Sequence, residues 1–302
     1  MLKRVILAVS LGLAGFAVHA QDRVTLGWGR LMSNDQIGDS QDRWRTGSYP
    51  VSRVRGADWN GHAAAAFGDT LELRGHAAVI APANLTTPSA TDRRYAGVLG
   101  FGLYSHFGWR GAEMSLGADL SVTGPQSGIG GFQSWFHGLL GMVEPSNAVL
   151  NAQIGNKIIP GINAEIGRSF GDKVQIRPYA EARTGVETLL RVGGDITIGA
   201  LGRDDLLLRD ETTGQRYRAV EGAREQGLSL TMGGDVARVF DSALLADTGA
   251  AGLREDRYRL RAGLHWQGEK SSAFYGVSYL SPEFASQPEG QLVGALGLSL
   301  RF

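Results

Sequence analysis

Among the residues that can do acid–base chemistry, His137 occupies the most informative position. It lies in the stretch IGGFQSWFHGLLGMVEP, residues 129–145, whose periodicity predicts an amphipathic helix that Pro145 ends. The apolar face of this helix consists of Phe132, Trp135, Phe136, Leu139 and Leu140, and the polar face of Gln133, His137, Gly141 and Glu144. An imidazole titrates near neutral pH, so His137 is a candidate general base, although a lone histidine is more often structural.

A second group of candidate residues is acidic and lies near the amino terminus. It consists of Asn34, Asp35, Asp39 and Asp42. Their side-chain oxygens are the ligands that a hard cation such as calcium prefers, but the spacing of an EF-hand loop is absent. Ser, Asn, Asp and Gly together are also typical of a solvated turn, which composition alone favours.

The other histidines and the known catalytic motifs give weaker signals. His62, His76 and His265 lie among charged residues and His106 lies among aromatic ones, so lining and packing roles are the simpler interpretation. The chain lacks a G-x-S-x-G elbow, a G-x-x-x-x-G-K-[ST] loop and an H-E-x-x-H motif. No serine neighbours His137, which weighs against the serine-dependent outer-membrane lipid hydrolases.

Composition excludes several classes of protein. The 302 residues include no cysteine, so disulfides, thiolate catalysis and zinc ribbons are excluded. Lys plus Arg equals Asp plus Glu at 30 each, which argues against binding of nucleic acid. Residues 1–20 combine Lys3 and Arg4, an apolar run and a small-residue cleavage site, which predicts a secretory signal peptide. The alternative, a membrane-spanning helix, needs a longer apolar run.

Residues 21–302 alternate between apolar and polar with a period of two, which predicts strands that position these candidates. In 257–266, for example, Tyr258, Leu260, Leu264 and Trp266 oppose Arg257, Arg259, Arg261 and His265. A soluble sandwich and a membrane barrel both accommodate this pattern. Strands of about ten residues, charged polar faces and a final Phe302 favour an all-β, antiparallel transmembrane barrel of about twelve strands.

An even number of strands puts both ends of the barrel domain on the periplasmic side. The expected strands lie near 22–32, 47–56, 69–81, 95–107, 112–122, 162–170, 174–186, 190–200, 225–240, 256–267, 272–280 and 291–302. The links 33–46, 82–94, 123–161, 241–255 and 281–290 are then external, so the acidic cluster and His137 share one end. Segment 201–224, long and charged, falls on the periplasmic side, and the pattern does not explain its length.

Four stretches, in order, resemble the outer-membrane lipid A 3′-O-deacylase family. Asn34-Asp35 and then Asp42-Arg43-Trp44-Arg45-Thr46-Gly47 are similar to its Asn-Asp and Thr-Asp-Arg-x-Tyr-Thr-Asn-Gly. Asp92-Arg93-Arg94-Tyr95-Ala96-Gly97 is similar to its Asp-Arg-Pro-Tyr-Ala-Gly. Trp135-Phe136-His137, Glu144-Pro145 and Gln153 are similar to its Trp-x-His, Glu-Pro and Trp-Asp-Asn-Gln, and the terminal strand to Phe302 agrees. The chain departs from the pattern at Arg45, Arg94 and Leu150.

The resemblance implies a twelve-stranded barrel whose site lies between the outer part of the wall and a loop helix. The implied reaction is hydrolysis of an ester-linked acyloxyacyl group of lipid A, in which His137 activates water and calcium stabilises the oxyanion. The implied catalytic residues are His137, Asn34 and Asp35, and the implied calcium ligands are Asp35 and Glu144. Thr46, Ser52 and Arg93 are implied to bind the substrate. The resemblance also implies a monomer in the bacterial outer membrane, acting on lipopolysaccharide.

The alternative hypothesis is a non-enzymatic barrel that is structural or weakly pore-forming. Charged residues on the polar faces, among them Glu72, Arg74, Asp119, Arg177, Glu181, Arg257 and Arg259, are able to pair and fill the lumen. The two hypotheses differ in geometry, because an enzyme needs Asn34, Asp35 and His137 to converge at the outer rim.

Overall fold

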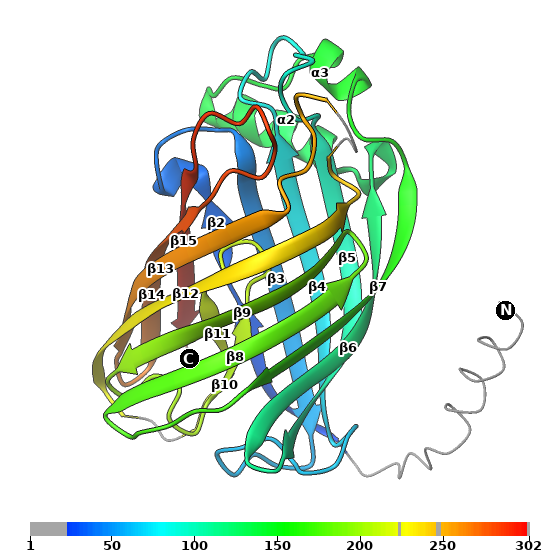
Figure 1. Cartoon of the computed structure of the whole chain (residues 1–302). Helices are drawn as coiled ribbons and strands as arrows, with labels where there is room; N and C mark the ends of the chain where they lie inside the picture. Colours follow the sequence, from blue (N-terminus) through cyan, green and yellow to red (C-terminus); the bar gives the residue numbers. More distant parts are fainter. Residues whose placement is uncertain (1–22, 223–224, 246–248, 301–302) are drawn as a thin grey trace, which may run out of the picture.

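One antiparallel sheet closes into a tilted barrel (Figure 1). The structure is a computed structural model that describes residues 23–222, 225–245 and 249–300; the predicted signal peptide and Phe302 lie outside them. The strands are β1 Val24–Arg30, β2 Met32–Asn34, β3 Trp44–Gly56, β4 Thr70–Ala81, β5 Ala96–Trp109, β6 Ala112–Thr123, β7 Lys157–Gly167, β8 Val174–Thr184, β9 Glu187–Ile198, β12 Gly227–Ser242, β13 Asp256–Gln267, β14 Ser271–Leu280 and β15 Gln291–Leu300. Because β1 and β2 are pieces of one pass, the wall has twelve passes, which confirms the prediction.

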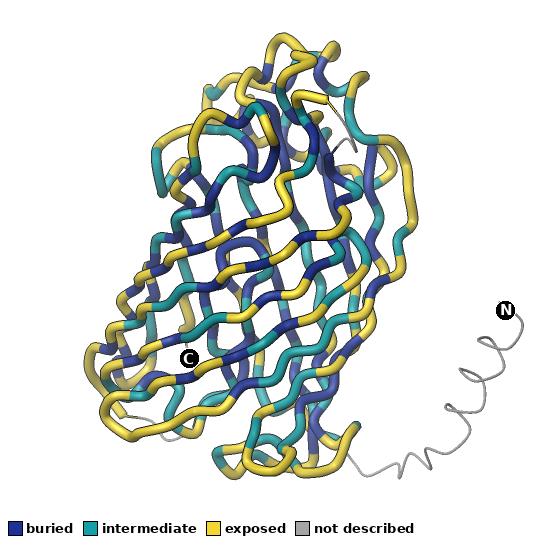
Figure 2. Tube along the Cα trace, viewed as in Figure 1, coloured by how far each residue is buried: buried dark blue, intermediate teal, exposed yellow. Residues whose placement is uncertain are grey.

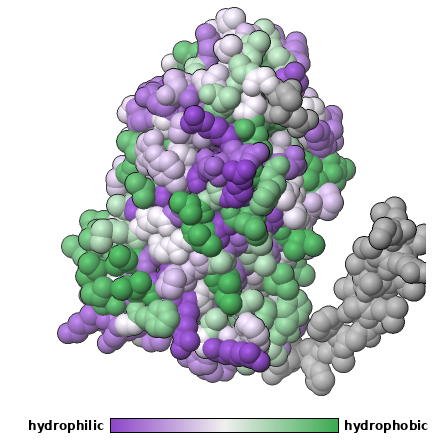
Figure 3. Space-filling view, in the orientation of Figure 1, coloured by the Kyte–Doolittle hydropathy of each residue, from purple (hydrophilic) through white to green (hydrophobic). Residues whose placement is uncertain are grey.

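The wall is apolar on its outside and polar on its inside. Along β13, Leu260 and Trp266 are exposed while Arg259 and Arg261 are buried, and Figure 2 shows the same alternation along the neighbouring strands. Figure 3 shows apolar side chains spread over the outer face of the strands. This arrangement inverts that of a soluble protein and is typical of a barrel whose outer face meets lipid.

Ion pairs fill the lumen, as the sequence predicted for its charged faces. Asp235 accepts from Arg259 Nε at 3.0 Å and from Arg261 Nη1 at 2.6 Å. Arg261 Nη2 also donates to Asp195 at 2.6 Å. Buried charges are tolerated where they are paired and hydrogen-bonded. The charged residues on the polar face of one strand are therefore neutralised by opposite charges on other strands.

Segment 201–224 does not form an extended periplasmic link, because part of it folds back into the lumen as a hairpin. The hairpin consists of β10, Leu206–Arg209, and β11, Arg216–Val220, which lie behind β8 and β9 in Figure 1. Arg209 pairs with Glu165 at 2.8 Å and with Asp195 at 2.9 Å. On its other side, Leu208 and Tyr217 join a buried cluster with Leu31, Val54, Phe274 and Ala295. The charged and the apolar residues of the hairpin thus both have partners inside the barrel. The segment is long because it enters the lumen to reach them.

Removing Arg209 is expected to destabilise the barrel. Arg209→Ala leaves Glu165 and Asp195 buried with one fewer cation, and breaking a buried ion pair costs about 3–5 kcal/mol. The temperature at which the folded band on a gel converts to the unfolded one measures the effect. Arg238→Ala is the control, since Arg238 pairs with Glu255 and Asp256 on the exposed surface, and it should change that temperature little. Equal temperatures for both variants would contradict the structural role of the hairpin.

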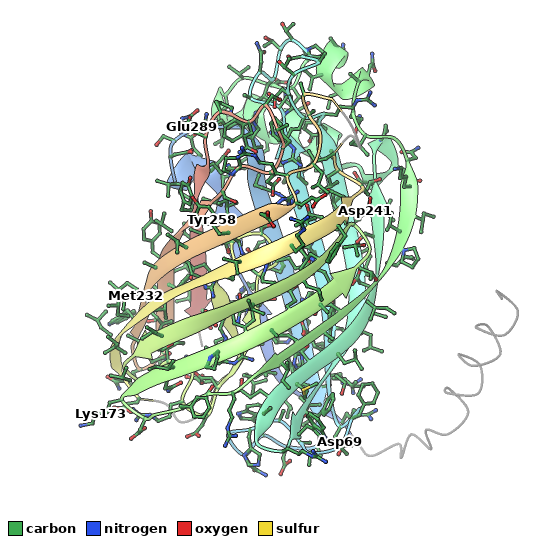
Figure 4. All side chains as sticks on the ribbon, in the orientation of Figure 1. Asp69, Lys173, Met232, Asp241, Tyr258 and Glu289 are labelled. Carbon is green, nitrogen blue, oxygen red and sulfur yellow. The ribbon has the colours of Figure 1, made fainter. Side chains whose placement is uncertain are left out.

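The helices gather at one end of the barrel, together with the external links. They are η1 Asp35–Ile37, η2 Pro125–Ser127, α2 Ile129–Leu140 and α3 Asn147–Asn151. Glu289 labels this end in Figure 4, and Asp69 and Lys173 label the opposite one. None of the described helices is long and apolar enough to cross a membrane.

Candidate active site

Helix α2 turns its polar face towards the barrel and its apolar face outward. Gln133 and His137 are buried, whereas the side chains of Trp135 and Leu139 are 62% and 67% exposed. The helix packs against the upper ends of β4 and β5, where Gly97 permits the contact: a Cβ there would lie 2.5 Å from Cβ of Ile129. The periodicity of the sequence therefore predicted both faces, and the buried face carries His137.

The hydrogen bonds of His137 fix which of its ring nitrogens can accept a proton. Nδ1 lies 2.7 Å from the carbonyl oxygen of Val143. A carbonyl only accepts, so Nδ1 carries the hydrogen and Nε2 of the neutral ring holds the lone pair. Nε2 lies 3.3 Å from Oδ2 of Asp42 and 3.3 Å from Nε2 of Gln133. The candidate base atom is therefore Nε2, and it faces a carboxylate.

Asp42 is the carboxylate that connects His137 to the acidic cluster. It lies in the link before β3, and its Oδ1 has no hydrogen-bond partner. Burial raises the pKa of Asp42, while the adjacent His137 and the hydroxyl of Thr46 lower it. The sequence placed Asp42 in the acidic cluster but gave it no role; its contact with a residue 95 positions away depends on the packing of α2.

Asp35 is fully buried beside Asp42, and no cationic side chain pairs with it among its described contacts. Its Oδ2 accepts from the backbone N–H of Arg43 at 2.7 Å, and its Oδ1 has no partner. Burial raises the pKa of Asp35 to about 9; the Arg43 N–H opposes this, and repulsion from Asp42 and Asp39 adds to it. Two neighbouring carboxylates that lack a counter-charge are typical of a cation site.

Asn34 has a structural role at the start of the same segment. Its Oδ1 accepts from the N–H of Gln36 at 2.8 Å and caps η1, which begins at Asp35. The backbone oxygen of Asp35 in turn accepts from three N–H groups, those of Gly38, Asp39 and Ser40. The cap and this turn hold the backbone of Asp35 rigidly, so its carboxylate cannot relax away from Asp42.

Other oxygens without a hydrogen-bond partner belong to residues that adjoin His137 or Asp42. Besides Asp35 Oδ1 and Asp42 Oδ1, they are Gln133 Oε1 and the hydroxyl of Tyr95, whose pKa burial and Asp42 raise. Among the described residues, no three His, Asp or Glu side chains form a metal-binding group. The available set is thus two carboxylates with neutral oxygens, which suits a hard cation such as calcium better than zinc.

Glu144, which was predicted to be a calcium ligand, lies apart from this cluster. Helix α2 ends at Gly141, which adopts a left-handed conformation with φ 67°, rather than at Pro145 as the sequence predicted. Glu144 therefore leaves the His137 face: it is exposed, its Oε1 lies beside Gly138, and no contact within the described residues joins it to Asp35. The predicted end of the helix at Pro145 was wrong because a left-handed glycine, Gly141, ends the helix first.

Ser52 and Arg93 pair with residues outside this cluster. Ser52 donates to Glu72 at 2.6 Å and lies 3.1 Å from the hydroxyl of Tyr217 on the hairpin. It is six residues along β3 from Thr46, which is about 20 Å at the rise of a strand. Arg93 is buried and pairs with Glu283 at 2.5 Å. Of the predicted substrate residues, only Thr46 lies next to Asp42.

The departures from the family pattern have structural explanations. Arg45 extends into the lumen, where it pairs with Glu283 at 2.8 Å and Glu187 at 2.9 Å. Leu150 packs beside Tyr95, on the element that supports α2. The contacts of both residues are structural, and His137, Asp42 and Asp35 keep their arrangement beside them.

The chain matches one protein family over nearly its whole length. The family described as "Outer membrane protein LpxR" matches residues 5–302. No curated protein sequence matches the chain.

Solved structures share the architecture of the chain. LpxR from Salmonella typhimurium is similar with a TM-score of 0.74 at 16% identity, over 91% of this chain and 100% of that one. The NanC porin has a TM-score of 0.41 at 5% identity, over 91% and 100%, and the β domain of the Bordetella autotransporter BrkA has 0.43 at 11%, over 91% and 99%. The first likeness, at this identity, shows a common fold.

Proposed function

Because the chain belongs to the LpxR family of outer membrane proteins, we propose that it removes an acyloxyacyl group from lipid A by hydrolysing the ester that attaches it. One observation carries the proposal: the lone pair on Nε2 of His137 lies buried beside Asp42, which in turn neighbours Asp35, under a helix whose outer face is apolar. Ester hydrolysis needs a base for water and positive charge for the oxyanion, and this cluster has groups for both.

His137 would accept a proton from water as the water oxygen attacks the ester carbonyl. The proton goes to Nε2, and the resulting imidazolium is stabilised by Asp42 at 3.3 Å and by the Val143 carbonyl at 2.7 Å. When the tetrahedral intermediate collapses, the same proton passes to the leaving oxygen, which becomes a free hydroxyl on the remaining lipid. The products are a fatty acid that carries its acyloxy group and a partly deacylated lipid A.

We propose that Asp35 and Asp42, with Oε1 of Gln133, hold the calcium ion. The unpaired oxygens on these three residues support this set, whereas the exposed position of Glu144 does not support a role as a ligand. When bound, calcium supplies the positive charge that stabilises the oxyanion. It also relieves the repulsion between the two carboxylates.

The outer face of α2 supports a lipid substrate. Phe132 stacks on Phe136 with ring centroids 6.0 Å apart, and Trp135 and Leu139 are exposed beside them. An apolar face of this kind is stable in the acyl region of a leaflet, so the buried side of the helix holds His137 next to the lipid. One barrel carries every candidate residue, so we propose that it acts as a monomer.

The pore-forming alternative has less support. The β10–β11 hairpin occupies the lumen and is fixed there by Arg209 and the apolar cluster around Tyr217. A blocked lumen does not require an enzyme, but it removes the feature on which conduction would depend.

Asp42→Asn is expected to lower kcat by roughly 10²- to 10³-fold, because a neutral amide no longer stabilises the imidazolium of His137 and is also a weaker calcium ligand. The KM for lipid A should change little. Initial rates of fatty-acid release by the purified barrel measure both constants. Asp39→Asn is the matched control, since Asp39 pairs with Arg43 at 3.5 Å in the same loop. Equal losses in both variants would remove the assigned role of Asp42.

Mass spectrometry of lipid A from cells that express the chain in their outer membrane tests the proposed reaction. We expect a product that lacks one acyl group with calcium present, and none when calcium is chelated. Unchanged lipid A, with the barrel folded in the membrane, would overturn the proposal.

A further inference from the structure

The barrel wall is open along part of one seam. Strand β2 pairs with β15 through three residue pairs that end at Met32 and Leu296. Beyond that point the described part of the chain has no pairing between β1 and β15. The stretch from Gly297 to Leu300 therefore has no strand partner on the β1 side. At a rise of 3.3 Å per residue, it is about 13 Å long.

The opening arises because the first strand leans into the lumen. Between β1 and β2, Leu31 is 1% exposed and packs in the cluster that includes the hairpin residue Ala219. Strand β1 approaches the hairpin so closely that a Cβ on Gly27 would lie 2.1 Å from the carbonyl oxygen of Ala219. Packing against the hairpin thus replaces pairing with β15.

A cavity of about 450 Å³ passes through the wall at this seam. Its lining includes residues of the outer face, namely Trp28, Arg30, Leu298 and Leu300. It also includes Arg216 and Arg218 of the lumenal hairpin, together with His265 and Lys270. Because β15 ends here, at the end opposite to α2, the cavity lies in the periplasmic half of the barrel (Figure 1).

The cavity has an excess of positive charge. Arg30, Arg216, Arg218 and Lys270 line it, against one carboxylate, Glu221. Arg218 is already neutralised by Asp205 at 2.9 Å, behind the cavity. Arg216 is the cross-strand partner of Arg209, and its guanidinium lies 3.9 Å from Glu113 on β6, away from the seam. Arg30 and Lys270 therefore provide the cations for an anion that enters the opening.

We propose that this opening binds the phosphate headgroup of a phospholipid from the periplasmic leaflet. The phosphate would lie between Arg30 and Lys270, and the acyl chains along Trp28, Leu298 and Leu300, which are 62%, 68% and 64% exposed. An unpaired strand edge is costly in hydrocarbon, and a headgroup with its water satisfies those backbone groups. The site is independent of the proposed deacylase reaction, which lies at the other end.

Lipid-borne labelling of single cysteines tests the proposal, because the chain has no cysteine of its own. Ser299 faces the lumen at the open seam, and Ser299→Cys is reconstituted in phosphatidylcholine vesicles that contain a phospholipid with maleimide on its headgroup. The matched control is Thr197→Cys, a lumenal position at the same end of β9, which pairs on both sides with Gln175 and Thr231. A soluble maleimide measures the general reactivity of each cysteine.

After division by the reactivity with soluble maleimide, we expect the lipid-borne reagent to label Cys at 299 about tenfold more than Cys at 197. This difference is expected if the headgroup enters the barrel only at the seam. When Lys270→Gln and Arg30→Gln are combined with Ser299→Cys, labelling by the lipid-borne maleimide should fall several-fold. Labelling by the soluble maleimide should stay unchanged. Equal labelling at both positions would overturn the proposal. Two further measurements identify the source of the anion. If excess inorganic phosphate abolishes the lipid-borne labelling, and dilution of the maleimide lipid with unlabelled phospholipid does not change it, the site binds a free anion instead.

Discussion

Replacing His137 with glutamine is expected to reduce lipid A deacylation by roughly 10²- to 10⁴-fold, the usual contribution of a general base. The side chain of glutamine has a similar volume and polarity, so the buried face of α2 should keep its packing against β4 and β5. It has no lone pair of imidazole basicity, and water must then attack without proton removal. Fatty-acid release by the purified variant, with calcium present, measures the loss.

The control for this prediction is His106→Gln, the same change at another buried histidine, whose Nε2 lies 2.8 Å from Glu72 in the lumen. It leaves His137 and its neighbours unchanged, so the base remains and activity should fall far less. Both variants must show the folded gel band of the parent. An active His137→Gln variant would exclude His137 as the base.

Asp35→Asn is expected to abolish calcium-dependent activity and, at the same time, to stabilise the calcium-free barrel above neutral pH. The pKa of Asp35 is raised from 3.8 to about 9 by burial. In the unfolded chain this group ionises near pH 4, so the folded state binds one more proton between pH 4 and 9, and stability falls as pH rises through that window. The variant has no such proton to lose and should gain a few kcal/mol, about the size of the linkage.

Unfolding temperatures in chelator across pH 5 to 9 test this second prediction. The parent should lose stability with rising pH, and the variant should lose much less. Calcium should restore the parent and leave the variant unchanged, because a neutral amide is a weaker ligand. Identical pH profiles for the two proteins would contradict the assignment of Asp35 as a buried carboxylate that awaits a cation.

The wall of the barrel was predictable because period two is a local property of sequence. The faces of β13 could be assigned residue by residue, and the helix around His137 by its apolar spacing. The β10–β11 hairpin was not predictable, since its strands have only four and five residues. Its partners, such as Glu165 and Asp195 for Arg209, come from strands that only the closed barrel brings together.

The candidate site was predictable in part, for the same reason. Asp35 and His137 were identified from motifs, and they do converge through Asp42. Motif order does not reveal which partners a residue meets in the folded barrel, so Ser52 and Arg93 were grouped with them although Ser52 pairs with Glu72 and Arg93 with Glu283. A bulge between Trp44 and Gly47 in β3 interrupts the regular alternation of side chains between the two sides of the wall. The spacing of the sequence does not predict this bulge.

The most direct test of the central claim is hydrolysis in water enriched in oxygen-18. The purified barrel is mixed with lipid A and calcium, and the released fatty acid is analysed by mass spectrometry. Attack by water that His137 activates predicts one heavy oxygen in the fatty acid, and no labelled acid from His137→Gln. Unlabelled acid, transfer of the acyl group to another lipid, or release by the variant at the parental rate would contradict it.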